Sequence, residues 1–151
     1  MPQSLAAVYL HLVFSTKHRQ PFLRDRETRD EVHRFLGGTS KTLDCPPIIV
    51  GGVEDHVHLL CRFGRRLSIS DWVKELKRIS NLHVKERGAN FGDFQWQGGY
   101  GVFSVSQGDI KTVKHYIANQ AEHHRKISFQ DELRALFRAH EQEWDERYIW
   151  D

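Results

Sequence analysis

The order of the predicted elements indicates an α+β fold, with a ferredoxin-like βαββαβ core, an antiparallel sheet and additional C-terminal helices. Two observations support this class. Short segments rich in β-branched and aromatic residues alternate with longer amphipathic segments. The chain also has 151 residues, about the length of one domain, so residues 1–151 are expected to form a single domain.

Four segments have the composition of strands, because β-branched and aromatic residues dominate them. Pro21 ends the loop that follows the first segment, and Pro46-Pro47 precede the second. The predicted strands are residues 6–14, 48–53, 56–63 and 101–106.

Four segments carry apolar residues at helical spacing. The first is expected to stop at Gly37-Gly38, and Ser70 and Asp109 are expected to cap the second and third. A Gly-rich, aromatic loop follows the second helix. The predicted helices are residues 24–36, 70–86, 110–125 and 130–142, and the loop is residues 88–99.

The composition excludes several classes of protein. A net charge of +2 is too small for a strongly basic or an acidic disordered tail, and Cys45 and Cys61 are too few for a disulfide framework. The early apolar run, residues 5–14, is too short to cross a bilayer and lacks the features of a signal peptide. We therefore expect a cytoplasmic protein with no membrane partner. The ten histidines are the one unusual feature.

His56 and His58 lie two residues apart in a predicted strand, so their side chains share one face of the sheet. Two imidazoles at this spacing can bind one metal ion or hold one phosphate. The simpler interpretation is a pair of exposed or hydrogen-bonded histidines. Because the strand is otherwise apolar, a buried pair would need polar partners.

Tyr116 and Gln120 are spaced i, i+4 and share a face of the third predicted helix. The simpler interpretation of Tyr116 is an aromatic at the edge of the core, with its hydroxyl in water. Alternatively, its phenol attacks a phosphodiester, and a neighbouring cation held partly by Gln120 stabilises the developing charge. His123 and His124 extend the polar end of this helix and could equally be solvated.

Together with their flanking motifs, these residues resemble the single-tyrosine HUH transposases of small bacterial insertion sequences and their REP-associated relatives. The resemblance covers nearly the whole chain. Each motif is weak alone, but their joint presence in this order is specific. The motifs are Thr16-Lys17-His18-Arg19, residues 54–60, residues 72–77, residues 94–101, residues 103–106, Tyr116-Ile117-Ala118-Asn119-Gln120 and His123-His124-Arg125.

The resemblance implies a role for each site residue. His56, His58 and Gln120 would be ligands of a divalent metal ion, Mg²⁺ or Mn²⁺, and Tyr116 would be the nucleophile. The implied activity is a DNA transposase that cleaves and rejoins single-stranded DNA at hairpin-bearing element ends through a 5′-phosphotyrosine intermediate. It implies a homodimer without a nucleotide cofactor, in the cytoplasm of a bacterial or archaeal cell.

DNA contacts are expected from local basic segments. Residues 65–87 contain seven basic and three acidic side chains, whereas residues 131–151 contain three basic and seven acidic ones. A basic helix is often simply solvated, but its cations can also neutralise phosphates. The aromatic loop at 88–99 either packs over the sheet or stacks on unpaired bases. The candidate DNA-binding residues are Lys17, Arg19, Arg65, Arg66, Lys74, Lys77 and Arg78.

Other functions stay open at this stage. A non-catalytic module with an RRM-like fold could bind single-stranded nucleic acid through the same basic and aromatic residues. A metal-dependent hydrolase would release a free 5′-phosphate and would not need Tyr116. A domesticated relative that processes chromosomal palindromic repeats would use the same chemistry as a mobile element's own enzyme.

Overall fold

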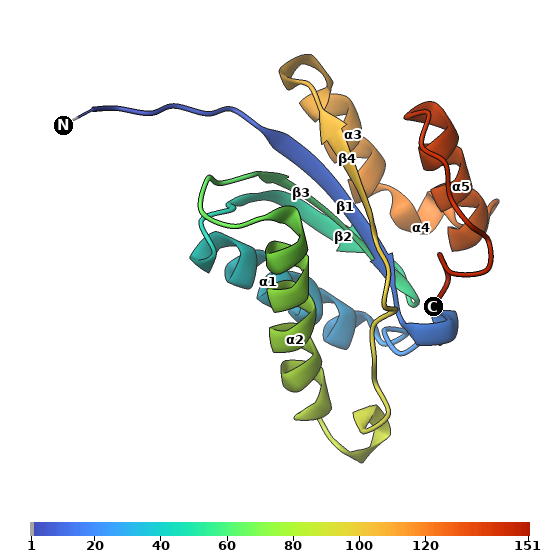
Figure 1. Cartoon of the computed structure of the whole chain (residues 1–151). Coiled ribbons are helices and arrows are strands. Elements are labelled where there is room, and N and C mark those ends of the chain that lie inside the picture. Colours follow the sequence, from blue (N-terminus) through green and yellow to red (C-terminus); the bar gives the residue numbers. More distant parts are fainter. Residues whose placement is uncertain (1) are drawn as a thin grey trace.

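The fold is built on a four-stranded antiparallel sheet. The computed structural model describes residues 2–151. Its strands lie in the order β2-β3-β1-β4, so the two central strands are β3 and β1 (Figure 1). This is the order of a ferredoxin-like βαββαβ core, and the predicted fold class is confirmed. The strands are β1 (Tyr9–Ser15), β2 (Pro47–Gly52), β3 (His56–Arg62) and β4 (Gly101–Val105).

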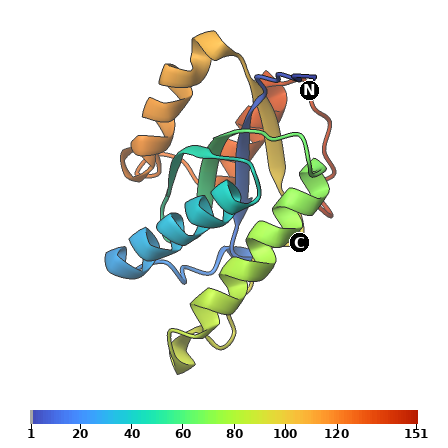
Figure 2. The same ribbon diagram turned by 90° about the vertical axis from the view of Figure 1, so that its left-hand side faces the viewer.

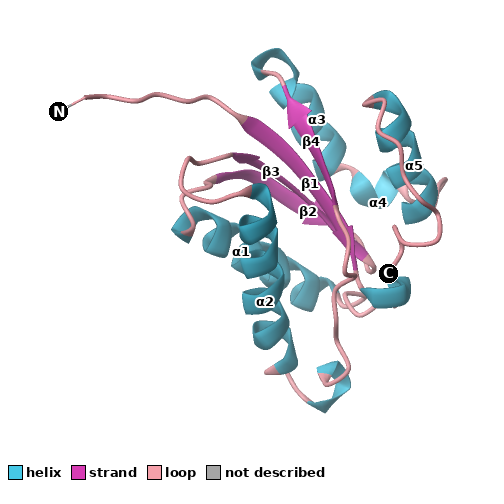
Figure 3. Ribbon diagram, in the orientation of Figure 1, coloured by secondary structure: helices cyan, strands magenta, loops and turns pink. Residues whose placement is uncertain are grey.

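Helices cover both faces of the sheet. The helices α1 (Arg26–Thr42) and α2 (Ile69–Lys85) pack on one face, and Figure 2 views the molecule from their side. The opposite face is covered by three shorter helices, which Figure 3 shows on the far side of the strands. These are α3 (Ile110–Ala118), α4 (Gln120–His123) and α5 (Phe129–Ala139).

The pleat of β1 separates two cores. Alternate side chains of a strand point to opposite faces. Leu10, Leu12 and Phe14 pack with α1 and α2, whereas Val13 packs with Leu133 of α5. The face beneath α3, α4 and α5 is the one that carries polar side chains from β1 and β3, so it is the face that holds a site.

The first helix is longer than predicted. It begins after Asp25, whose carboxylate accepts a hydrogen bond from the Thr28 amide, and it continues through Gly37-Gly38 to Thr42. The expected stop at the glycines is wrong. A Cβ at Gly37 would lie 3.5 Å from Pro47 and Val50, so the glycine brings the helix close to β2. This tertiary packing outweighs the low helix propensity of the pair.

The other three predicted helices also differ from the structure. Ser68, not Ser70, caps α2, because its hydroxyl accepts a hydrogen bond from the Asp71 amide. The expected continuous helix at 110–125 is interrupted at Asn119, where the backbone leaves helical geometry. The last helix, α5, ends at Ala139, before the predicted end at residue 142.

The aromatic loop after α2 is packed against the protein rather than open. It contains one short helical turn, η2 (Ala89–Phe91). Phe94 is fully buried and Trp96 is 7% exposed, and the Trp96 indole donates a hydrogen bond to Ser80. The packed-loop interpretation is therefore confirmed for these two rings. Cys45 and Cys61 are free and buried, as expected.

Two further short turns complete the fold, η1 (Lys17–Arg19) and η3 (Gln107–Asp109). His18 and Arg19 of η1 both have positive φ, an arrangement that is uncommon outside glycine. Across residues 2–151, no helix is both long enough and apolar enough to span a membrane.

At Gly51 of β2, the backbone of α3 lies very close to the sheet. A Cβ at this position would lie 2.7 Å from the Ile117 carbonyl oxygen and 2.8 Å from the Ile117 side chain. We expect Gly51→Ala to lower the free energy of unfolding by about 1–3 kcal/mol, as overpacking does. Gly38→Ala is the matched control, because nothing lies within 4 Å of its Cβ position.

The control should raise the free energy of unfolding by up to about 1 kcal/mol, since alanine is the better helix former. Urea unfolding followed by circular dichroism measures both variants. Equal stabilities for the two variants would contradict this account of the contact between β2 and α3.

Candidate metal and nucleophile site

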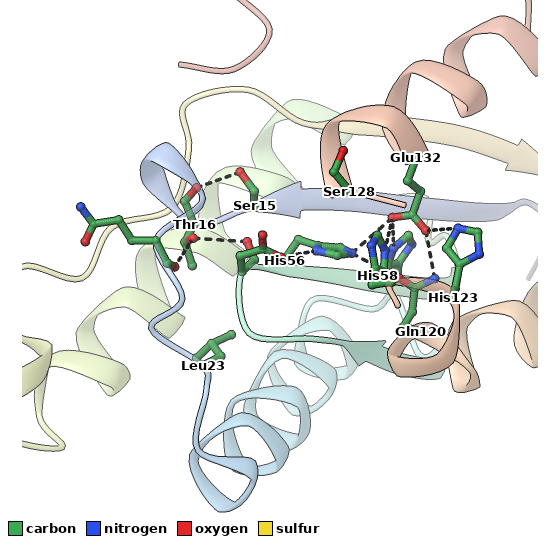
Figure 4. Close-up of polar contacts among 12 residues, drawn as sticks. Ser15, Thr16, Leu23, His56, His58, Gln120, His123, Ser128 and Glu132 are labelled. Carbon is green, nitrogen blue, oxygen red and sulfur yellow. Dashed lines mark hydrogen bonds and ion pairs between the residues drawn. The ribbon is translucent and has the colours of Figure 1, made fainter. Parts of the chain in front are cut away.

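His56 and His58 are the first and third residues of β3, and both side chains are fully buried. The antiparallel register places His56 opposite Ser15 and His58 opposite Val13 of β1. Their imidazoles point toward the layer of α3, α4 and α5 (Figure 4). The two side chains therefore share one face of the sheet, as predicted, and they lie in the core rather than at the surface.

Each of these two histidines has one ring nitrogen held by a neighbour. His56 Nδ1 lies 2.7 Å from a carboxylate oxygen of Asp55, and His58 Nδ1 lies 2.8 Å from His11 Nε2. Burial lowers the pKa of His11 to about 3, so this third histidine is neutral. With Nδ1 occupied, the Nε2 atom of each ring is directed into the site.

Glu132 of α5 lies at the centre of the site and is 1% exposed (Figure 4). Its Oε1 atom is 3.2 Å from His56 Nε2, 3.0 Å from His58 Nε2 and 3.0 Å from His124 Nε2. Its Oε2 atom faces other partners, Tyr116 and Gln120. One carboxylate thus joins three histidines on one side to the tyrosine and the amide on the other.

Tyr116 and Gln120 enter the site from both sides of the interruption at Asn119. The Tyr116 hydroxyl donates a hydrogen bond to Glu132 Oε2 and lies 3.3 Å from His123 Nε2. The Gln120 amide nitrogen donates to the same carboxylate at 3.1 Å, and its oxygen lies 3.2 Å from His56 Nε2. The four residues predicted for the site, His56, His58, Tyr116 and Gln120, are therefore brought together within one chain.

The charges of the site are strongly coupled. Burial would raise the pKa of Glu132, but hydrogen bonds from His124, His56 and His58 hold it well below its usual range. Burial opposes the charged form of His56, yet Asp55 and Glu132 outweigh burial and raise the pKa of His56 to about 9. Burial and the Glu132 charge also raise the pKa of the Tyr116 hydroxyl well above its ordinary value.

The donor atoms fit a divalent metal ion. One ligand atom from each of four residues lies within 4.8 Å of the other three, and the four are His56, His58, His124 and Glu132. Imidazole nitrogens with a carboxylate oxygen are donors that suit Mn²⁺ and other transition metals. The hydrogen bonds at Nδ1 are the supporting contacts that metal-binding histidines usually make.

A cavity of about 490 Å³ opens beside Tyr116. Tyr116 and Glu132 form part of its wall, with Phe103 of β4 and Val113 of α3. A second hollow of about 740 Å³ also borders β4, against the C-terminal residues Trp144 and Ile149. Tyr116 thus lines a mostly apolar cavity beside β4, the edge strand of the sheet.

With this geometry in view, the chain was compared with known proteins. The sequence profile described as "Transposase IS200 like" matches residues 4–120, more than half of the chain. The chain belongs to the IS200-like transposase family. None of the curated proteins matches it in sequence.

Two solved structures share the fold of this transposase. A candidate transposase from Deinococcus radiodurans is 26% identical, with a TM-score of 0.62 over 80% of this chain and 95% of that chain. A REP-associated tyrosine transposase bound to a REP hairpin is 12% identical, with a TM-score of 0.59 over 82% of this chain and 72% of that chain.

The candidate DNA-binding residues of the transposase are dispersed. Lys17 and Arg19 lie nearest the site, because Thr16 before them is hydrogen-bonded to the backbone of Asp55, next to His56. The Arg19 guanidinium donates to the Trp150 carbonyl at 3.3 Å. The others lie beyond the opposite end of β3 or on α2, across the sheet from the site; they are Arg65, Arg66, Lys74, Lys77 and Arg78.

Lys77 is used within the fold. Its ammonium donates to the carbonyl oxygens of Gln97 at 2.8 Å and Gly99 at 2.7 Å, and it lies 5.1 Å from the centre of the Phe14 ring. Burial lowers the pKa of Lys77 to about 8. These contacts fasten residues 97–99 beside β1 and occupy the ammonium of Lys77 within the fold.

Sequence reasoning missed three residues of the site, His11, His124 and Glu132. His11 was visible only as one of ten histidines, and His124 only as part of a polar helix end that could equally be solvated. Glu132 had a clearer signal, because it lies three residues after Phe129 and next to Leu133, on the apolar side of an amphipathic helix. A carboxylate at a core-facing position needs a partner, and that requirement could have identified it.

In protein stripped of metal by a chelator, the attraction between His56 and Glu132 should stabilise the fold most at neutral and lower pH. The folded-state pKa of His56, about 9, exceeds its ordinary value of 6.5. The stabilisation is therefore fully present below about pH 6.5 and is lost as the pH rises through about 9. Its size is on the order of 1–3 kcal/mol.

Urea unfolding of the chelator-treated wild type and Glu132→Gln between about pH 6 and pH 10 tests this expectation. The difference in free energy of unfolding should shrink toward the alkaline end. Glu122→Gln is the control, because Glu122 is exposed and lies outside the cluster. A difference that does not change with pH would show that the His56–Glu132 pair does not carry the stabilisation.

Proposed function

We propose that this transposase cleaves and rejoins single-stranded DNA at hairpin-bearing element ends through a 5′-phosphotyrosine intermediate on Tyr116. The single observation that supports this most is the position of the Tyr116 hydroxyl. It is hydrogen-bonded to Glu132, the same carboxylate that contacts His56 and His58. A nucleophile and a cluster of metal-binding donors thus share one buried site in a transposase-family chain.

The proposed reaction is a transesterification at the scissile phosphate. The Tyr116 oxygen bonds to phosphorus, and the bond from phosphorus to the 3′-oxygen breaks. Glu132 Oε2 accepts the hydrogen bond of the phenol and orients it, and the phenol proton is transferred through solvent to the departing 3′-oxygen, which becomes a hydroxyl. The phosphodiester energy is retained in the tyrosine ester, so a second 3′-hydroxyl can reverse the step without ATP.

His56, His58 and Gln120 are the residues proposed to hold a divalent ion, Mg²⁺ or Mn²⁺. When bound, the ion would polarise the scissile phosphate and stabilise negative charge on its oxygens and on the phenolate. This chain's own contribution is to orient the donors. Asp55 and His11 hold the two imidazoles, and Glu132 holds the Gln120 amide.

The proposed substrate follows from the shared fold. The REP-associated relative was solved bound to a REP hairpin, and this chain has the same fold with its nucleophile at an open cavity. Lys17 and Arg19 are the basic residues proposed to approach the DNA near the site. Because transposition must hold two DNA ends, we propose that the working unit is a homodimer.

Tyr116→Phe should abolish the covalent protein–DNA adduct, since it removes the only atom that can form the phosphotyrosine bond. Binding of the hairpin DNA should stay within about threefold of wild type, because the ring remains in place. Labelled single-stranded flanking DNA incubated with Mn²⁺ and analysed on a denaturing protein gel measures the adduct.

Tyr148→Phe is the matched control, because Tyr148 is exposed in the C-terminal tail. It should form the adduct as wild type does. Cleavage that survives in Tyr116→Phe with release of a free 5′-phosphate would support a hydrolase instead. Metal-independent binding with no adduct from the wild type would support a non-catalytic nucleic-acid-binding module.

Metal removal should stop cleavage without preventing folding. Treatment with a chelator should reduce adduct formation by at least about 100-fold, and excess Mn²⁺ or Mg²⁺ should restore it. His58→Ala should show the same loss without restoration. Circular dichroism of each sample checks that the fold persists, and adduct formation in chelator would contradict a metal-dependent reaction.

A further inference from the structure

Three imidazoles, rather than two, converge on one point of the site. The Nε2 atoms of His56, His58 and His124 lie 3.2, 3.0 and 3.0 Å from the same oxygen of Glu132. His124 comes from the turn after α4, not from the sheet. Its distance to the common point is no longer than those of the two strand histidines.

His124 is also oriented as the other two are. Its Nδ1 atom lies 2.8 Å from the Ile127 carbonyl oxygen, which can only accept a hydrogen bond. Without an ion, Nε2 donates to Glu132; because Nδ1–H donates to the Ile127 carbonyl, loss of the Nε2 proton would leave the lone pair on Nε2, the form in which an imidazole binds a metal ion. The Asp55 carboxylate imposes the same arrangement on His56, and neutral His11 can accept from His58.

His123, the preceding residue, differs in each respect. It is one-third exposed, and its Nε2 atom faces the other oxygen of Glu132 at 3.4 Å. It does not belong to the four residues whose donor atoms gather within 4.8 Å. The two adjacent histidines therefore have different environments, and only His124 is directed at the convergence point.

Glu132 supplies the anionic donor of this group. Its side chain is 1% exposed on the core-facing side of α5, where an isolated carboxylate would be strongly destabilising. Its Oε1 atom faces the imidazoles and its Oε2 atom faces the Tyr116 hydroxyl. A carboxylate held in this way can bind an ion through one oxygen while it positions the nucleophile through the other.

We propose that His124 and Glu132 are additional ligands of the metal centre, which adds a third histidine and a carboxylate to His56, His58 and Gln120. This inference deepens the proposed function and rests on its metal centre. Both residues lie beyond residue 120, where the match to the family ends. The C-terminal segment of this chain thus completes a site that the family-matched part begins. The nitrogen-rich set favours Mn²⁺ over Mg²⁺, which prefers oxygen ligands.

The alternative occupant of the convergence point is the carboxylate itself, as a plug that an ion must displace. The two roles predict opposite signs. Removal of a ligand weakens metal binding, whereas removal of a competing group strengthens it. Measurement of metal affinity, without DNA, therefore separates the two roles and does not depend on catalysis.

The experiment is a titration of chelator-stripped protein with Mn²⁺, followed by the electron paramagnetic resonance signal of free Mn²⁺. Glu132→Gln and His124→Ala should each weaken Mn²⁺ binding by at least about 10–100-fold, the range found even for supporting residues of metal sites. Glu122→Gln and His115→Ala are the matched controls, because both side chains are exposed, and they should bind within about threefold of wild type. An unchanged or tighter affinity in Glu132→Gln and His124→Ala overturns the proposal.

A folding check and a comparison with DNA adduct formation make the outcome unambiguous. Because His124 and Glu132 lie on different elements, His124→Ala decides the question if Glu132→Gln fails to fold, as judged by circular dichroism. If wild type binds Mn²⁺ through His124 and Glu132 but forms no DNA adduct, the proposed function fails while the ligand assignment stands. If the adduct forms but neither variant weakens Mn²⁺ binding, the ligand assignment alone fails.

Discussion

The site depends on how the negative charge of one buried carboxylate, that of Glu132, is compensated. Glu132 is nearly inaccessible to solvent, so its charge is stable only because His56, His58 and His124 surround one of its oxygens. That requirement ties α5 to β3 and to the turn after α4. It also places the second oxygen against Tyr116, so the interaction that makes the burial tolerable also orients the proposed nucleophile.

The sheet and its covering helices make this compensation possible. The pleat of β3 directs both histidines to one face, and β1 supplies His11 on the same face to hold His58. Gly51 then allows α3 to approach the sheet closely at Ile117, the residue after Tyr116. A chain with a bulkier residue at this point would move the tyrosine away from the histidine pair.

This arrangement explains why the chain contains so many histidines. Half of the ten histidines gather around Glu132 or support those that do, namely His11, His56, His58, His123 and His124. The acidic C-terminal segment likewise contributes the buried carboxylate of the site, Glu132. Of the basic residues of α2, Lys77 is used within the fold to fasten a loop.

The sequence by itself determined the topology, the shared face of His56 and His58 and the family, because strand alternation and local motifs are properties of short segments. It also placed Tyr116 and Gln120 together, although the intervening break at Asn119 was not foreseen. It could not place helix ends that depend on packing, such as the continuation of α1 through Gly37-Gly38. Only the tertiary structure decided that His11, His124 and Glu132 join the site, because these residues are separated in sequence and meet only when β1, the turn after α4 and α5 pack together.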